Sequence, residues 1–174
     1  WQSGLDPMGL IASGSLRFEG GYGWWDETPV CPEDVECFLD ESDDLFNYQR
    51  LWGTAAVTHP LFLGLAGALE VGAGTVWGEV PVQREFYLGG YSNLRGFHSG
   101  DIFGTAAWFT RLEVANDLPA ARFSLFADAG WAGDRSSWVF DDPFVDVGVG
   151  GSLLDGIFRF DVARAVRRGS DWRI

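Results

Sequence analysis

The chain has 174 residues, a length typical of one domain, and its 12 basic and 25 acidic side chains give a net charge of −13. This acidity argues against a partner with a phosphate backbone, such as nucleic acid. Hydrophobic residues make up 47% of the chain, which excludes intrinsic disorder. There is no run of about 18 apolar residues, so the sequence predicts no membrane-spanning helix. The 24 glycines and nine tryptophans favour an all-β fold.

Apolar and polar residues alternate with a period of two along most of the chain, which is typical of β-strands. Between positions 121 and 131, for example, Ala121, Phe123 and Leu125 alternate with Arg122 and Ser124. The alternation predicts strands at 9–20, 47–58, 61–76, 104–116, 121–131, 143–153 and 157–166, and the start of an eighth at Asp171. Several runs are about twice as long as the five or six residues usual in soluble domains, which is long enough to cross a bilayer.

The connections between these strands alternate between short and long. The short ones are His59–Pro60, Asn116–Ala120 and Asp155–Gly156, and the long ones are 21–46, 78–103 and 132–142. Outer-membrane barrels show this asymmetry, with short turns on the periplasmic side and long loops outside. One face of each strand is apolar and the other is mixed, but a soluble β-sandwich would share that pattern. Strand length and loop asymmetry therefore carry the prediction of an antiparallel transmembrane β-barrel.

The long stretch 21–46 is strongly acidic, with nine Asp and Glu residues between positions 26 and 44. We interpret it as a solvated external loop. Its carboxylates would also suit calcium, but the spacing of an EF-hand is absent, and we predict no metal site. The stretch contains Cys31 and Cys37, whose spacing fits neither a CxxC redox motif nor a zinc site. We predict that they form a small-loop disulfide in an oxidising compartment, the alternative being two unpaired thiols.

Residues 80–103, with the sequence EVPVQREFYLGGYSNLRGFHSGDI, carry the most specific signal in the chain. A second motif, aromatic-x-Asp-x-Gly, follows at 126–130. The matching residues are Gly89, Gly90, Leu94, Arg95, Gly96 and Phe97 in the first motif, and Phe126, Asp128 and Gly130 in the second. The combination resembles the lumen-entering loop and barrel-wall motif of the BamA/TamA/FhaC superfamily of outer-membrane assembly and secretion barrels, the bacterial surface-antigen family. The resemblance covers residues 60–174 by motif and residues 1–59 only by strand pattern.

This resemblance implies a fold and a function. Residues 1–174 would form the C-terminal half, about eight strands, of a sixteen-stranded barrel, with 78–103 as a loop inserted into the lumen. On this resemblance we expect residues 1–174 to lack the N-terminal periplasmic modules of the family and to end within the closing strand. The implied function is insertion of client β-barrels or translocation of secreted polypeptides in the bacterial outer membrane. The implied partners are the outer-membrane lipid, these clients and accessory assembly proteins.

The expected burial of Arg95 raises a question of charge compensation that does not depend on the family resemblance. Its guanidinium is a permanent cation, and a loop folded into a lumen takes it partly out of water, so it needs carboxylate or carbonyl partners. Asp128 faces inward by alternation and is the partner we expect, with Glu113 and Asp161 as further candidates. We call this contact the Arg95 lock. The alternative for each acid is an ordinary polar residue of the lumen.

Small and aromatic residues complete the predicted lock. Gly89, Gly90 and Gly96 allow the tight backbone of the loop tip. Gly130 removes a side chain where the loop approaches the wall. Phe126 packs against the loop tip or the guanidinium.

Catalysis is not expected. The sequence contains no GxSxG elbow, no paired carboxylates in a catalytic arrangement and no cluster of metal ligands, so we predict neither an enzyme nor a bound cofactor. Within the family, the alternatives are the barrel of a two-partner secretion transporter and a barrel fused to a patatin-like lipase. Outside it, they are a self-contained eight-stranded structural or adhesion barrel and a soluble, secreted β-sandwich.

Overall fold

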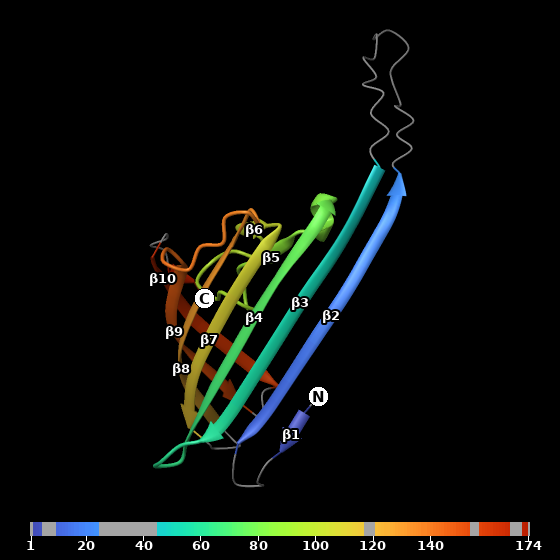
Figure 1. The fold of residues 1–174 in the computed structure, drawn as a ribbon. Coiled ribbons are helices and arrows are strands. Elements are labelled where there is room, and N and C mark those ends of the chain that lie inside the picture. The colour runs from blue at the N-terminus through green and yellow to red at the C-terminus, as the bar shows by residue number, and fades with distance from the viewer. Residues whose placement is uncertain are drawn as a thin grey trace.

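The computed structural model describes residues 2–4, 10–24, 45–116, 121–153, 157–167 and 172–173. Nine strands in these ranges form one antiparallel sheet, in which neighbours follow the chain order except that β4 pairs with β7 (Figure 1). They are β1 (Gln2–Gly4), β2 (Ile11–Trp24), β3 (Leu45–Pro60), β4 (Leu65–Glu79), β7 (Ala106–Asn116), β8 (Ala121–Gly133), β9 (Phe144–Leu153), β10 (Phe158–Arg167) and β11 (Trp172–Arg173). The expected all-β, antiparallel class is confirmed.

The seven predicted strands correspond to β2, β3, β4, β7, β8, β9 and β10, and the expected start of an eighth corresponds to β11. The predicted turn at His59–Pro60 is wrong, because β3 continues through Pro60 and the chain reverses at residues 61–64. Leu63 and Gly64 have φ angles of 59° and 69° there. Glycine adopts positive φ without steric cost, which explains why the reversal falls at Gly64. The other two predicted short turns include residues outside the described ranges.

The stretch 78–103 contains elements that alternation did not predict. A 3-10 turn, η1 (Val82–Arg84), precedes β5 (Phe86–Leu88), which pairs with β6 (Ile102–Gly104). The large sheet is curled, and Figure 1 shows the β5–β6 pair inside its curve. Contacts of β5 with β7 and β8, and of β6 with β8, place this loop against the concave face. Within the described ranges, no helix is long and apolar enough to cross a membrane.

The hydrophobic core lies between this loop and the concave face of the sheet. The loop contributes Phe86, Leu88, Leu94, Phe97 and Ile102, and the sheet contributes Tyr48, Val76, Ala107, Phe109 and Ala165. The ring of Trp52 packs between two of them, with centroid distances of 5.0 Å to Phe86 and 6.0 Å to Phe109. The loop and the curled sheet therefore share one core.

The opposite, convex face of the sheet is apolar and exposed. Leu16 on β2, Leu112 on β7 and Leu125 on β8 are each more than half exposed. Other exposed apolar residues on this face are Phe18, Val57, Leu69, Val71, Phe123, Val147, Val149 and Phe160. Side chains alternate along a strand, so these residues point away from the loop. A soluble sandwich would bury such a face, and its exposure here favours a lipid environment.

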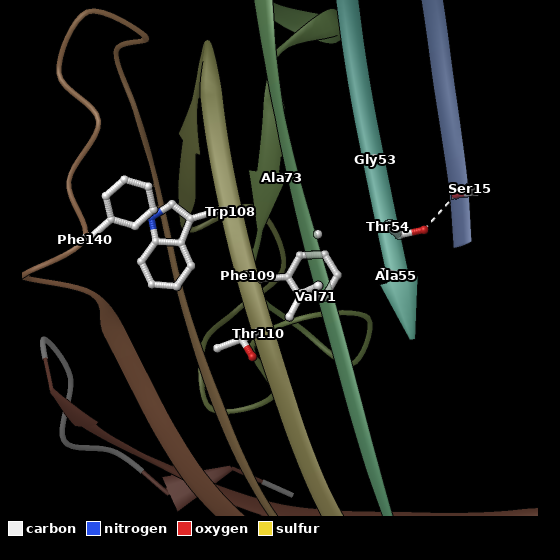
Figure 2. Close-up of a pocket in the computed structure, with 11 residues that line it drawn as sticks. Ser15, Gly53, Thr54, Ala55, Val71, Ala73, Trp108, Phe109, Thr110 and Phe140 are labelled. Atoms are coloured by element: carbon white, nitrogen blue, oxygen red, sulfur yellow. Dashed lines mark hydrogen bonds between the residues drawn. The ribbon is translucent and has the colours of Figure 1, made fainter. Parts of the chain in front are cut away.

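Aromatic side chains cluster on the convex face where residues 134–143 meet β7 and β8. Trp108 Nε1 donates a hydrogen bond to the carbonyl oxygen of Val139 (2.9 Å), and its ring stacks on Phe140 at 5.5 Å between centroids. Trp138 stacks on Phe140 and packs against Trp131, each at 6.0 Å. A groove of about 440 Å³ that no charged residue lines lies beside these rings. Figure 2 shows Trp108 and Phe140 at its edge. No residue of 78–103 lines this groove, although Phe109, which borders it, also packs in the core under the loop.

Candidate functional site

The tip of the loop, residues 89–100, is closed by its own hydrogen bonds. The backbone N–H of Gly90 donates to the carbonyl oxygen of Phe97 (2.8 Å). Asn93 Oδ1 accepts from the N–H groups of Gly89 (2.6 Å) and Leu94 (2.9 Å). Gly89 and Gly90 have φ angles of 108° and 81°, which glycine adopts far more readily than other residues. The glycine pair thus forms a tight turn that presents the next residues to the wall.

Arg95 makes three charge-assisted hydrogen bonds to the wall. Nε and Nη2 donate to the two carboxylate oxygens of Asp128 on β8 (2.8 and 2.9 Å), and Nη1 donates to Glu113 Oε2 on β7 (3.0 Å). The side chains of Arg95 and Asp128 are 2% and 0% exposed, and that of Glu113 is 15% exposed. A bidentate pair of this kind fixes orientation as well as charge. The loop is therefore tied to two adjacent strands by one side chain.

Phe126 lies under the guanidinium, with Arg95 Cζ 3.4 Å from the centroid of its ring, which is a cation–π contact. Burial by itself lowers the pKa of Arg95, but the hydrogen bonds and Coulomb attraction of Asp128 and Glu113 outweigh it and raise that pKa above its ordinary value. Next to Arg95, Leu94 is fully buried, and Phe97 packs edge-on against Phe144 with centroids 5.4 Å apart. The tetrapeptide 94–97 thus combines two apolar anchors with one ionic anchor.

The two remaining glycines of the motifs lie at close backbone approaches. A Cβ on Gly96 would lie 2.5 Å from Asp146 Cβ and 3.0 Å from the backbone nitrogen of Ala165, so Gly96 lies directly on the wall. A Cβ on Gly130 would lie 2.8 Å from the carbonyl oxygen of Trp108 and 3.2 Å from Phe109 Cβ. The nearest neighbours of Gly130 therefore belong to β7 rather than to the loop. Its missing side chain makes room for the adjacent strand.

Asp161, the third acid expected beside Arg95, pairs with Arg159 instead (3.3 Å). Arg159 also contacts Glu113 Oε2 at 3.3 Å and lies 5.1 Å from the ring of Tyr91 in the loop. Both Arg159 and Asp161 are on β10, and the curl of the sheet brings Arg159 toward the acid that Arg95 uses. Asp161 therefore belongs to the surrounding ion network and not to the contact with Arg95.

Arg111 is a contact residue that sequence reasoning missed. Its Nη1 donates to the carbonyl oxygen of Ser92 in the loop (3.2 Å) and to Glu70 Oε2 on β4 (3.3 Å). Its Nε lies 3.8 Å from Asp128 Oδ1. The signal was present, since Arg111 lies two positions before Glu113 on the same strand face. A cavity of about 330 Å³, bordered by Arg95, Arg111 and Glu70 among others, opens beside this network.

Asp146 on β9 is the second residue that was missed. It is fully buried and lies directly opposite Asp128 in the β8–β9 register. The alternation of residues 145–150 already put it on the same face as the glycines of β9. Only the register between β8 and β9 places it beside the lock.

Cys31 and Cys37, with their predicted disulfide, lie outside the described residues, as does most of the acidic stretch that contains them. In the part of the chain that is described, no group of three or more His, Cys, Asp or Glu side chains is arranged to hold a metal ion.

Long antiparallel strands, an exposed apolar face and a glycine-rich loop held on the concave face by a buried arginine define the class: a curled β-sheet that folds around its own loop. The family model for the Omp85 superfamily domain matches residues 42–154, which is more than half of the chain. The chain therefore belongs to the Omp85 superfamily, and the family expected from the loop motif is confirmed. Domains of this superfamily are outer-membrane proteins in bacteria. Among curated proteins, none matches the chain.

Proposed function

We propose that this chain forms the C-terminal half of a sixteen-stranded outer-membrane barrel. The complete barrel inserts client β-barrels or translocates polypeptides. In this proposal residues 78–103 enter the lumen, and the Arg95 lock holds them against the inner wall. The chain acts by shape and binding and catalyses no covalent chemistry. Its partners are outer-membrane lipid, client chains and accessory assembly proteins.

One observation carries the proposal: the guanidinium of Arg95 is buried and hydrogen-bonded to acids on two neighbouring strands. A surface loop has no need for such an arrangement, because an exposed ion pair contributes little to stability. A loop that must stay seated inside a barrel needs it, since loss of one partner would leave a buried charge unpaired.

The distribution of polarity over the two faces supports a membrane setting. The convex face is apolar and exposed, whereas the concave face has ion pairs such as Arg50–Glu19 and Arg111–Glu70. Outer-membrane barrels have this arrangement, with lipid outside and a polar lumen inside. In a bilayer, every strand edge must also find a partner, so the sheet would have to close with further strands.

Mechanistically, the seated loop would keep one part of the wall rigid. Because Arg95 joins β7 and β8, and the loop core packs on β3 and β4 as well, this region resists separation of its strands. A client strand would then enter elsewhere, at the weakly paired junction between the first and last strands of the barrel. That junction is what the family resemblance implies.

The test uses the purified protein in lipid vesicles with a urea-unfolded bacterial β-barrel as client. The readout is the rate at which the client becomes protease-resistant. Arg95→Ala should lose most of the acceleration over protein-free vesicles. The matched control is Arg17→Ala, since Arg17 is an exposed arginine on the concave face of β2.

Full acceleration by Arg95→Ala, together with unchanged heat-modifiability on gels, would remove the lock from the proposal. If the wild-type protein does not accelerate client insertion but moves a secreted polypeptide across the vesicle membrane, the translocation alternative is favoured. If it does neither, a structural or adhesion role replaces both.

A further inference from the structure

Two buried carboxyl groups lie side by side under the loop tip. Asp128 on β8 and Asp146 on β9 are directly opposite each other in the antiparallel register, and their side chains face the loop. Asp128 is 1% exposed and Asp146 is 0% exposed. Opposite residues of this kind have Cβ atoms about 5 Å apart, so their charges would interact strongly in the absence of water.

In the part of the chain that the structure describes, one of the two acids, Asp128, has a cation in contact and Asp146 has none within 4 Å. All three guanidinium nitrogens of Arg95 donate to Asp128 or Glu113. The second nearby arginine, Arg111, approaches Asp128 and not Asp146. Among the described residues, neither carboxyl oxygen of Asp146 accepts a hydrogen bond of full geometry, and its polar neighbours are the backbone N–H of Gly96 and the carboxyl group of Asp128. An ionised Asp146 would have only the backbone N–H of Gly96 and the more distant guanidinium of Arg95 to offset its burial beside Asp128.

The groups that face Asp146 come from three elements. They are Asp128 from β8, Arg95 and the backbone of Gly96 from the loop, and Ala165 from β10. A Cβ on Gly96 would come within 2.5 Å of Asp146 Cβ and 3.0 Å of its Cγ. The side chain of Asp146 is thus in direct contact with the backbone of the loop at Gly96. Keeping both Asp128 and Asp146 ionised at this separation would cost a large electrostatic free energy.

We propose that Asp146 is a positioning residue of the Arg95 lock and that it acts as a neutral carboxylic acid. Asp128 and Asp146 together then present one negative charge to Arg95, and Asp146 supplies the uncharged seat for Gly96. This inference rests on the proposed function for its purpose, but its chemistry can be measured on the folded protein without any client.

The first experiment is infrared spectroscopy of the purified protein in detergent at neutral pH. The wild-type protein should show the carbonyl stretch of a protonated carboxylic acid, and Asp146→Asn should lose that band. Asp161→Asn is the matched control, because Asp161 is also an acid of the concave face but pairs with Arg159, and this variant should keep the band. Absence of the band in the wild-type protein, or its survival in Asp146→Asn, overturns the proposal.

The second experiment measures the rate of unfolding by heat-modifiability. Asp146→Asn, which is neutral and of the same shape, should unfold at close to the wild-type rate, whereas Asp146→Leu, which overfills the seat of Gly96, should unfold roughly tenfold faster. A large increase for Asp146→Asn would show that the negative charge of Asp146 is needed, and the proposal would be wrong. If Arg95→Ala unfolds at the wild-type rate, the hypothesis of the Arg95 lock is wrong. If Arg95→Ala unfolds much faster but the infrared band of the wild-type protein is missing, only the role proposed for Asp146 is wrong.

Discussion

The two acids that hold Arg95 differ in their surroundings. Asp128 accepts two hydrogen bonds from the guanidinium and is fully buried. Glu113 accepts one, is 15% exposed and has Arg159 as a second cation. Removing the charge of Asp128 would therefore leave Arg95 with much less compensation than removing that of Glu113.

We predict that Asp128→Asn destabilises the protein by about 3–5 kcal/mol, the usual cost of breaking a buried ion pair from one side. Glu113→Gln should cost roughly 1–2 kcal/mol, because a neutral amide oxygen can still accept the bond from Nη1. Urea unfolding in detergent, followed by heat-modifiability, measures both. Equal losses for the two variants would contradict the unequal burial of the two acids.

A methyl group at Gly96 should disturb the lock by sterics alone. In Gly96→Ala the new Cβ would meet Asp146 Cβ and the backbone of Ala165, and overpacking of this kind costs about 1–3 kcal/mol. Gly14→Ala is the control, since its Cβ would meet only Thr54 O at an ordinary 3.5 Å. The comparison uses the midpoint of urea unfolding. A midpoint for Gly96→Ala no lower than that of the control would contradict the close approach.

For individual residues, the sequence predicts a contact well when the contact depends only on which face of a strand the side chain occupies. Alternation puts Glu113 and Asp128 on the inner face, and both contact Arg95. Alternation also places Asp161 on the inner face. Contact of an inward acid with Arg95 depends on the curvature of the sheet and on competing cations, and Asp161 pairs with Arg159 instead. Asp146 was missed for a related reason. A period of two gives the face of a residue but not the register that sets its neighbour across the ladder.

At the scale of elements, the small β5–β6 pair is the part of the fold that alternation could not predict. Its strands have three residues each, which is too short for a periodic pattern to be recognised. They exist because the loop packs on the sheet, burying Phe86, Leu88 and Ile102. The long strands, in contrast, carry enough alternating residues to be located within a few positions.

The stability of the β5–β6 pair should depend on the side chains that it buries against the sheet. Leu88→Ala should destabilise the protein by about 2–5 kcal/mol, because Leu88 is 2% exposed and its removal leaves a cavity in the core. Val82→Ala, at a position that is 56% exposed in the same loop, should cost far less. Hydrogen–deuterium exchange over residues 86–104 provides the readout, with faster exchange expected only for Leu88→Ala. Equal protection in both variants would mean that the loop does not depend on this core.

At the scale of the whole molecule, the two faces of the sheet should respond oppositely to charge. Leu125→Arg places a cation on the convex face, which would cost about 2–4 kcal/mol in the middle of a bilayer. Ser13→Arg places the same residue on the face that also bears Ser15 and Arg17, and should be tolerated. Folding yield into lipid vesicles distinguishes them. Equal yields for both variants would argue against a convex face that contacts lipid.

The stacked rings beside β7 and β8 give the protein a built-in optical reporter. Trp108, Trp131 and Trp138 lie close to one another and to Phe140, so their transitions should couple and produce a strong near-ultraviolet circular dichroism signal. Phe140→Ala should weaken that signal while leaving heat-modifiability unchanged, because Phe140 stacks on Trp108 and Trp138 and takes no part in the hydrogen bonds that hold Arg95. Docking of residues 134–143 on the outside of the wall can thereby be followed by spectroscopy while the loop inside remains seated.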